Sequence, residues 1–289
     1  MQSHPKRILV FAFNLCRQVF DTALIKCLNI FFALKVVLKT KNWKDYLLDT
    51  QGLSKQKQIT YVLRNGTKFI TRTKTKDRDI FVETAIADQY RTDKIFLDSK
   101  SAVLDIGAQA GFFSVFISRR VGKVFAFEPV PENFELLKKN LALNNRKNRV
   151  VAFNKAVAGK NGKQKIFLSE NNTGGHSFFG KSNLFGKNKG FIECNTISLE
   201  NVFSENKLEK CDLLKMDAEG AEYEILFNAP DKILEKITRI SMEAHFVGKN
   251  RPEHLIEFLS SKGFKVKKRK HYGDVLLFAE QKGKNTKFI

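Results

Sequence analysis

The sequence predicts an α/β fold in which helices cover both faces of a mostly parallel sheet. Three observations support this prediction. A glycine-containing loop over residues 107–111 stands between a hydrophobic strand and a helix, strands and helices alternate from residue 101 onward, and the apolar segments have the spacing of βαβ units. Such a fold brings the carboxyl ends of parallel strands to one edge of the sheet, where open α/β sheets bind ligands.

The expected elements of residues 101–280 follow in chain order. The first strands are expected at residues 102–106, 123–127, 150–157 and, as an edge strand, 164–168, with helices at 112–120 and 131–144. A surface loop rich in Gly, Asn and Lys is expected at residues 171–190. The later strands are expected at residues 213–216 and 237–242, followed by a helix at 252–262 and a closing hairpin of 264–268 with 275–279.

Two segments precede this core, and a short basic tail (residues 281–289) follows it. Residues 1–57 are predicted to be an amphipathic helical extension, because apolar residues recur at helical spacing between positions 12 and 38. Residues 58–100 are predicted to form a β-hairpin around Asn65-Gly66 and a helix over 77–90. The helix within residues 8–38 either packs on protein or lies on an anionic membrane, and the sequence leaves both alternatives open.

The composition is strongly basic. The 289 residues include 51 Lys and Arg against 30 Asp and Glu, a formal net charge of +21, but the basic residues are scattered from Lys6 to Lys287. This scatter favours a generally basic surface over one patch for an anionic partner. Charged residues interrupt the N-terminal apolar stretch and no cleavage site follows it, so we expect a cytoplasmic protein, with peripheral contact at the inner membrane face as an option.

The loop Gly107-Ala108-Gln109-Ala110-Gly111 points to a nucleoside-containing cofactor. Glycines at such a loop let backbone amides approach a ligand closely, and the G-x-G-x-x-G pattern of dinucleotide sites is absent. Asp105 puts a carboxylate at the strand end, where it suits an ammonium better than a pyrophosphate. Glu128, 23 residues later, can accept hydrogen bonds from both hydroxyls of a ribose. Together these residues favour S-adenosylmethionine.

Four segments resemble the FkbM family of methyltransferases, and the likeness covers about residues 58–280. They are Leu104–Gly111, Phe127–Asn133, Lys215–Glu222 and Glu243–His245. The resemblance implies a class I methyltransferase fold, which is Rossmann-like with a seven-stranded sheet. It also implies methyl transfer from S-adenosylmethionine to a hydroxyl oxygen, often of a sugar or a glycosylated product. One position departs from the family, which commonly has Asn where this chain has Gln109.

The expected cofactor-binding residues share one loop and the start of the helix after the second strand. They are Asp105, Gly107, Gln109, Gly111, Glu128 and Asn133. Asn133 has two open interpretations. It lies in the first turn of a helix, where a short polar side chain can satisfy free amides, and the family resemblance also implies a contact near the cofactor.

The expected reacting centre lies at the ends of two further strands. Asp217 follows the strand at 213–216 and Glu219 begins the next helix, while Glu243 and His245 alternate along the end of the following strand and so point to one face. We predict that His245 or Asp217 takes a proton from the hydroxyl and that Glu219 or Glu243 orients the base or the acceptor. Glu222 is expected to serve the helix start.

The reaction requires no metal and none is predicted, although Asp217, Glu219 and Glu243 could gather around Mg²⁺. The loop at 171–177 is either a lid that contacts the acceptor or an ordinary surface turn. The expected partner is a small-molecule or glycan hydroxyl acceptor, and the oligomeric state stays open. Two other functions remain: RNA 2′-O-methylation, which the absence of interleaved aromatic and basic residues disfavours, and a non-catalytic module that binds S-adenosylmethionine or a membrane.

Overall fold

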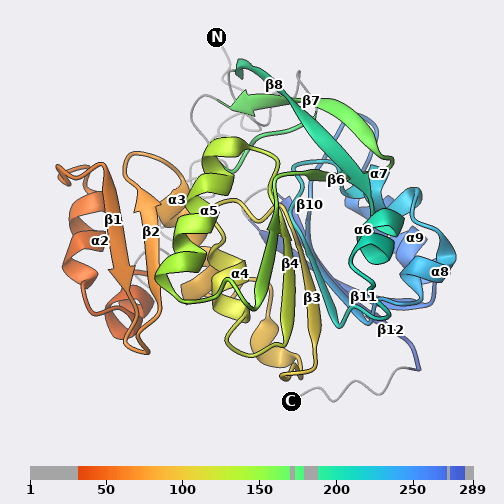
Figure 1. The fold of residues 1–289 in the computed structure, drawn as a ribbon, viewed down its shortest axis with the longest axis horizontal. Coiled ribbons are helices and arrows are strands. Elements are labelled where there is room, and N and C mark those ends of the chain that lie inside the picture. Colours follow the sequence, from red (N-terminus) through yellow and green to blue (C-terminus); the bar gives the residue numbers. More distant parts are fainter. Residues whose placement is uncertain (1–31, 170–172, 179–187, 272–273, 284–289) are drawn as a thin grey trace, which may run out of the picture.

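A computed structural model describes residues 32–169, 173–178, 188–271 and 274–283, and it confirms the predicted fold class. Its central sheet has seven strands in the order β11-β12-β10-β9-β3-β4-β5 (Figure 1). These strands are β3 (Ala102–Ile106), β4 (Lys123–Phe127), β5 (Val150–Phe153), β9 (Leu213–Met216), β10 (Arg239–Ala244), β11 (Phe264–His271) and β12 (Asp274–Gln281). The five strands from β10 to β5 are parallel, and β12 runs antiparallel to β10.

The strand order reverses between β3 and β9, in the middle of the sheet. The chain runs outward from β3 through β4 to β5 and later returns to β9 on the other side of β3. Ile106 pairs with Met216 in the register, and the amide of Asp217 donates to the carbonyl of Ile106 at 3.0 Å. The loops that leave β3 and β9 therefore start side by side and then diverge, which is the arrangement that opens a ligand crevice.

Helices cover both faces of this sheet (Figure 1). One face carries α4 (Phe112–Ile117) and α5 (Pro131–Leu143), and the other carries α6 (Leu199–Glu205), α7 (Glu222–Phe227), α8 (Asp231–Leu234) and α9 (Pro252–Ser261). Val103 packs in the buried cluster of the first face and Leu104 in that of the second. Successive strand residues point to opposite faces, so a continuous apolar strand can serve two layers.

The segment of residues 58–100, here called the platform, docks on α5. Its hairpin of β1 (Gln58–Val62) and β2 (Lys68–Arg72) turns at Asn65-Gly66, as predicted. Asn140 exchanges two hydrogen bonds with the backbone of Ile70, and Asn144 does the same with Lys68. Two amide side chains four residues apart on α5 thus take the place of a neighbouring strand at the edge of β2.

Three expectations about local structure were wrong in part. The helix predicted at 77–90 is α3 (Asp77–Phe81) followed by a π-helical turn, η1 (Val82–Ile86). The strand predicted at 150–157 divides into β5 and β6 (Ala156–Ala158), which lie in different sheets. Within the loop predicted at 171–190, the last residues belong to β8 (Asn188–Ser198), which pairs with β7 (Gly162–Ser169).

The N-terminal extension is described only in part. Residues 1–31 lie outside the described residues, as do 284–289 of the basic tail. Residues 32–39 are helical and α2 (Trp43–Thr50) follows. Val36 is fully buried in the cluster that holds the platform, whereas Leu34 and Leu38 are exposed. No helix within the described ranges is both long and apolar enough to span a bilayer. Contact of residues 8–38 with a membrane surface stays a prediction.

Replacing Gly107 with Ala is expected to lower the free energy of unfolding by about 3 kcal/mol or more, measured by urea denaturation. A Cβ at Gly107 would lie 1.7 Å from the carbonyl oxygen of Asp217, and the φ of 73° adds a left-handed penalty of about 1 kcal/mol. Gly66→Ala is the matched control, because its φ is 85° and nothing lies within 4 Å of its Cβ. Equal losses in the two variants would contradict the close approach of the two loops.

Candidate active site

A cavity of about 670 Å³ opens at the carboxyl ends of β3, β4, β9 and β10. This volume lies within the usual range of small-molecule sites, about 300–1,000 Å³. Its walls come from the loop after β3, the end of β4, the platform and the short segment 173–178. Elements that are far apart in the chain therefore share one site.

Glu128 occupies one end of this cavity. Its Oε2 accepts the backbone N–H of Gln109 at 2.8 Å, and its Oε1 accepts that of Val130 at 2.9 Å. The side chain is buried, and burial raises its pKa to about 7. The apolar side chains of Val157 and Ile166 line the same cavity. A fixed acceptor beside apolar walls suits a ribose with its base, so this end fits a nucleoside.

A buried hydrogen-bond network fixes the side chain of Gln109. Its Nε2 donates to Asp77 Oδ1 at 2.7 Å, and its Oε1 accepts the amide of Ala110. Asp77 is fully buried and also accepts two hydrogen bonds from the guanidinium of Arg72. The contact of Asp77 with Arg72 keeps the pKa of its carboxyl below the usual value despite burial. Gln109 thus links the loop after β3 to the platform, and its extra length relative to Asn spans the gap.

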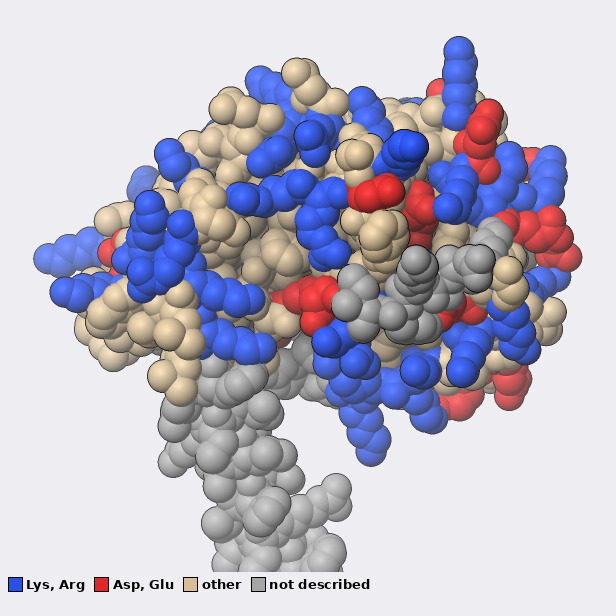
Figure 2. Space-filling model, turned by 90° about the horizontal axis from the view of Figure 1, so that it is seen from below, with Lys and Arg blue, Asp and Glu red and all other residues tan. Residues whose placement is uncertain are grey.

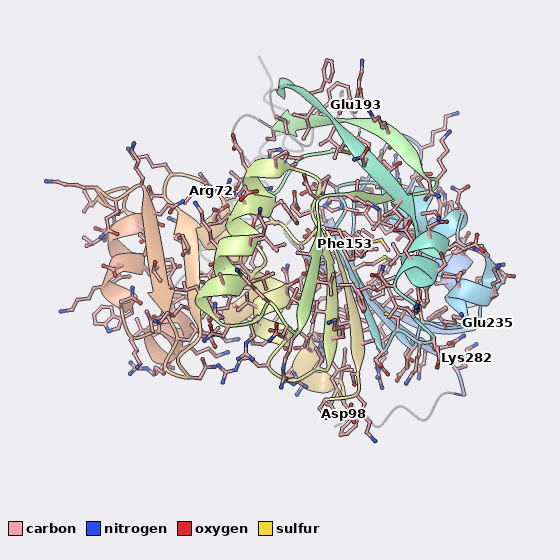
Figure 3. The ribbon with its side chains drawn as sticks, viewed as in Figure 1. Arg72, Asp98, Phe153, Glu193, Glu235 and Lys282 are labelled. Carbon is pink, nitrogen blue, oxygen red and sulfur yellow. The ribbon has the colours of Figure 1, made fainter. Side chains whose placement is uncertain are left out.

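Of the two interpretations of Asn133 that the sequence left open, the structure excludes the helix cap, and the contact near the cofactor stays a prediction. Its Oδ1 accepts from Arg72 Nη2 at 2.7 Å, and its Nδ2 donates to the carbonyl of Thr173 at 2.9 Å. Figure 3 shows Arg72 on β2 beside α5. Asn133 lines the cavity, lies 3.4 Å from Glu128 Oε1, and makes no hydrogen bond that caps α5. It joins the platform and the segment 173–178 to the nucleoside end of the cavity.

The structure corrects the predicted position of Asp105. Its carboxylate is fully buried and does not line the cavity: Oδ1 lies 3.1 Å from Lys215 Nζ, and Oδ2 accepts from Ser114 at 2.6 Å. A buried cation from β9 therefore takes the place predicted for the ligand's ammonium. Gly111 also lies outside the lining, at the start of α4, where a Cβ would lie 2.9 Å from Leu137 Cγ. Gly107 does line the cavity.

The opposite end of the cavity gathers all four predicted catalytic residues, Asp217, Glu219, Glu243 and His245. His245 is buried, with its Nε2 3.4 Å from Glu219 Oε2 and 4.0 Å from Asp217 Oδ1. Glu219 has a φ of 49°, which is unusual for a residue with a side chain and places strain at this turn. The structure thus joins the ends of β9 and β10 in one cluster.

Glu222 contacts the Nδ1 side of the His245 imidazole and positions the ring. It is fully buried as the first residue of α7, and its Oε1 lies 3.0 Å from His245 Nδ1 while also accepting the amide of Ala218. The sequence predicted only that Glu222 serves the helix start. Because Nδ1 faces a carboxylate, the ring is held in one orientation, with Nε2 toward Glu219 and Asp217.

Charges within the cluster shift several pKa values. Burial disfavours a charge on His245, but Glu222 and Glu219 outweigh burial and raise its pKa well above the usual value. Burial, aided by Asp217, raises the pKa of Glu219 to about 8 and that of Glu243 to about 9. Of the two bases that the sequence predicts, His245 or Asp217, a protonated His245 could not take a further proton. The raised pKa of His245 favours its protonated form beside the carboxyl group of Glu222, which leaves Asp217 as the candidate base.

Two groups of side chains in this cluster have the donor atoms of a metal site. One is Asp217, Glu219 and His245, and the other is Glu243, His245 and Asp274, with the donor atoms of each group within 4.8 Å of one another. Two carboxylates and one imidazole are a suitable donor set for a divalent ion. The sequence predicts chemistry without a metal, and this stays a prediction.

The segment 173–178 contacts both ends of the cavity. Thr173 donates to Asp77 Oδ1 at 2.8 Å, and Ser177 Oγ donates to the carbonyl of Glu219 at 2.6 Å. Gly174 and His176 line the cavity, and burial lowers the pKa of His176 to about 4. Residues 171 and 172 lie outside the described residues. The described part has the position that a lid or acceptor contact requires.

Sequence reasoning missed four residues of this region, namely Asp77, Tyr90, Glu222 and Asp274. Glu222 was named but given a local role. The other three reach the site from the platform and from β12, which the motifs do not cover. An isolated polar residue among hydrophobic ones, such as Tyr90, is too common in sequences to be recognised as a site residue.

The face of the molecule that Figure 2 shows is basic without one dominant cluster, because groups of Lys and Arg are spread over it with Asp and Glu between them. Lys76 and Arg78 line the cavity itself. This distribution is consistent with the scatter of basic residues along the sequence.

Comparisons with known proteins agree with these features. The model of the Methyltransferase FkbM domain matches residues 105–266. Methyltransferase sdnD of Sordaria araneosa is 27% identical over 213 residues, covering 64% of this chain and 82% of that protein. AMB antimetabolite synthetase AmbE of Pseudomonas aeruginosa is 26% identical over 225 residues, covering 65% of this chain but only 10% of that protein.

Solved structures of methyltransferases are also similar. Methyltransferase FkbM from Methylobacillus flagellatus KT is 15% identical with a TM-score of 0.46, covering 65% of this chain and 46% of that one. SMU.1697c, a putative methyltransferase from Streptococcus mutans solved in complex with SAH, is 14% identical with a TM-score of 0.42, covering 67% of this chain and 94% of that one.

Glu243→Gln is expected to raise the free energy of unfolding by about 1–3 kcal/mol at pH 8 and by less at pH 5. Because its pKa is about 9 in the folded chain, Glu243 binds a proton there that the unfolded chain releases above about pH 4.5. The free energy of unfolding of the wild type therefore falls as pH rises from about 4.5 to 9. The Glu243→Gln variant has no carboxyl group at this position and does not lose this stability. Urea denaturation at both pH values measures it, with the exposed Glu257→Gln as control. A gain of equal size at both pH values would refute the role of ionisation.

Proposed function

The chain belongs to the FkbM methyltransferase family, and on that premise we propose that it transfers a methyl group from S-adenosylmethionine to a hydroxyl of a sugar, glycan or glycosylated metabolite. The observation that carries the choice of a hydroxyl is the cluster of Asp217, Glu219 and His245 at the strand ends. An aliphatic hydroxyl is a weak nucleophile until a base takes its proton, and this cluster supplies one.

The nucleoside end of the cavity fits the proposed cofactor. Glu128 presents a carboxylate whose two oxygens are held by backbone amides, in a position suited to ribose hydroxyls. Gly107 and Ala108 bring bare backbone to the cavity between Glu128 and Asp217. S-adenosylmethionine would supply a methyl group activated by its sulfonium. The chain's own residues must then align the acceptor oxygen and exclude water, contributions worth about 7–11 kcal/mol when alignment is good.

Asp217 is the residue best placed to take the proton. Its side chain is 25% exposed, against 15% for Glu219 and 5% for His245, so an acceptor in the cavity reaches Asp217 first. His245 already holds a proton at neutral pH because of its raised pKa. In the proposed step the acceptor O–H bond breaks and its proton passes to Asp217 Oδ1. The freed electron pair of the acceptor oxygen would form the O–C bond while the bond between the methyl carbon and the donor's sulfur breaks, with the electron pair of that bond going to the sulfur. The imidazolium of His245 stabilises the charged cluster throughout.

A polyhydroxylated acceptor suits the remaining lining. Glu83 of the π-helical turn, Glu243 of β10 and Asp274 of β12 all face the cavity. Burial raises the pKa of Glu83 to about 7 and that of Glu243 to about 9, so near neutral pH these groups can donate as well as accept hydrogen bonds. Neighbouring sugar hydroxyls also donate and accept, and several such contacts would set which hydroxyl lies beside Asp217.

Incubation with radiolabelled S-adenosylmethionine and fractionated cell glycans, lipids and RNA tests the proposal. We expect label in the glycan fraction, and a loss of about 100-fold or more with Asp217→Asn, because amide nitrogen and oxygen are poor bases. The matched control is Asp231→Asn, which changes an exposed carboxylate at the start of α8. Label that enters only RNA, or full transfer by Asp217→Asn, would overturn the proposed acceptor or base respectively.

Label transfer is expected to persist, within about twofold, in excess EDTA, because His245 already supplies the positive charge among the carboxylates. The same assay measures it, with and without added Mg²⁺ or Mn²⁺. Loss of transfer in EDTA and its return with either ion would show instead that the cluster is a metal centre.

A further inference from the structure

Tyr90 reaches the reacting end of the cavity from outside the segment that the family model matches. It follows the π-helical turn η1 of the platform, whereas the match covers residues 105–266. The side chain is 1% exposed, and it lines the cavity. Leaving a buried hydroxyl without a hydrogen-bond partner costs about 1–3 kcal/mol, so the partner of this phenol is of interest.

That partner is Asp217. The hydroxyl of Tyr90 donates to Asp217 Oδ2 at 3.0 Å, and the other oxygen, Oδ1, lies 4.0 Å from His245 Nε2. The two carboxylate oxygens are therefore distinguished: one is held by the phenol, and the other is left toward the imidazole. Burial, with Asp217 and Glu243 nearby, raises the pKa of Tyr90, so the phenol stays protonated and remains a donor.

Two contacts fix the ring of Tyr90, and a third fixes its backbone. Lys215 Nζ lies 5.3 Å from the ring centroid, and the ring of Phe113 packs edge-on at 5.5 Å. The carbonyl of Tyr90 accepts a hydrogen bond from Ser241 Oγ of β10 at 3.1 Å. Tyr90 is thus in contact with β9, α4 and β10. The direction of its hydroxyl is therefore set by the core of the sheet and not by the platform alone.

We propose that Tyr90 is a positioning residue for methyl transfer, which holds Asp217 Oδ2 so that Oδ1 stays turned toward His245 and the acceptor hydroxyl. The proposal rests on the proposed function, in which Asp217 takes the proton. The carboxylate of Asp217 can otherwise rotate about its last bond, since that torsion is broad. If the carboxylate is fixed, Oδ1 of Asp217 stays in line with the proton of the hydroxyl that is to be methylated. Small misplacements of such reacting groups reduce the rate strongly.

The test compares Tyr90→Phe with Tyr61→Phe. Tyr61 is a second buried tyrosine of the platform, and it lies outside the cavity lining, so its variant controls for loss of a buried hydroxyl. In the labelled-transfer assay, with the fraction that accepts label, Tyr90→Phe is expected to lower kcat about 10- to 100-fold and to leave KM for S-adenosylmethionine within about twofold. Tyr61→Phe is expected to change neither constant.

A double-mutant cycle separates positioning from general damage. In the Asp217→Asn background, Tyr90→Phe is expected to cost nothing further, because its effect acts through the Asp217 carboxylate. Independent, multiplying losses would overturn the proposal, as would an unchanged kcat in the single variant.

Crystal structures of the wild type and of Tyr90→Phe provide a readout that needs no acceptor. We expect the Asp217 carboxylate to rotate in the variant, so that Oδ1 leaves its position beside His245 Nε2. An unchanged carboxylate would refute the positioning role even if transfer were slower. If no cell fraction takes label with the wild type, the proposed acceptor fails, and the structures still decide whether Tyr90 holds Asp217.

Discussion

A buried lysine beneath the loop after β3 organises the site. Lys215 Nζ lies 3.1 Å from Asp105 Oδ1, donates to the carbonyl of Gly107 at 2.7 Å and faces the ring of Tyr90. Breaking a buried pair of this kind by removing one partner costs about 3–5 kcal/mol, because the remaining charge is uncompensated. This one ammonium group of β9 therefore contacts β3, the loop at residues 107–111 and the platform, and it fixes their positions relative to one another.

The same contacts keep two loops unusually close. The backbone of Gly107 leaves no room for a side chain beside the carbonyl of Asp217, and Glu219 adopts a left-handed conformation two residues later. Burying several carboxyl groups together also lowers the stability of the fold when they ionise, as the raised pKa of Glu243 indicates. Backbone strain and like charges are concentrated at this one cavity, whereas the rest of the sheet is well packed. Functional sites are typically less stable than their surroundings in this way.

The platform contributes residues to both ends of the cavity. It contributes Asp77, which holds Gln109 at the nucleoside end, and Tyr90, which holds Asp217 at the reacting end. Asn140 and Asn144 of α5 bond to the edge of β2 and join the platform to the core. Both ends of the cavity therefore depend on residues that precede the first strand of the sheet.

The sequence by itself determined the fold class, the hairpin at Asn65-Gly66, the positions of most sheet strands and the gathering of Asp217, Glu219, Glu243 and His245. These follow from local period, turn chemistry and the rule that parallel strands end at one edge. Only the tertiary structure decided that Asp105 faces Lys215, that Glu222 orients His245 and that acidic neighbours raise the pKa of His245. Those outcomes depend on which side chains meet across strands and on the burial of their charges, and a one-dimensional pattern contains neither.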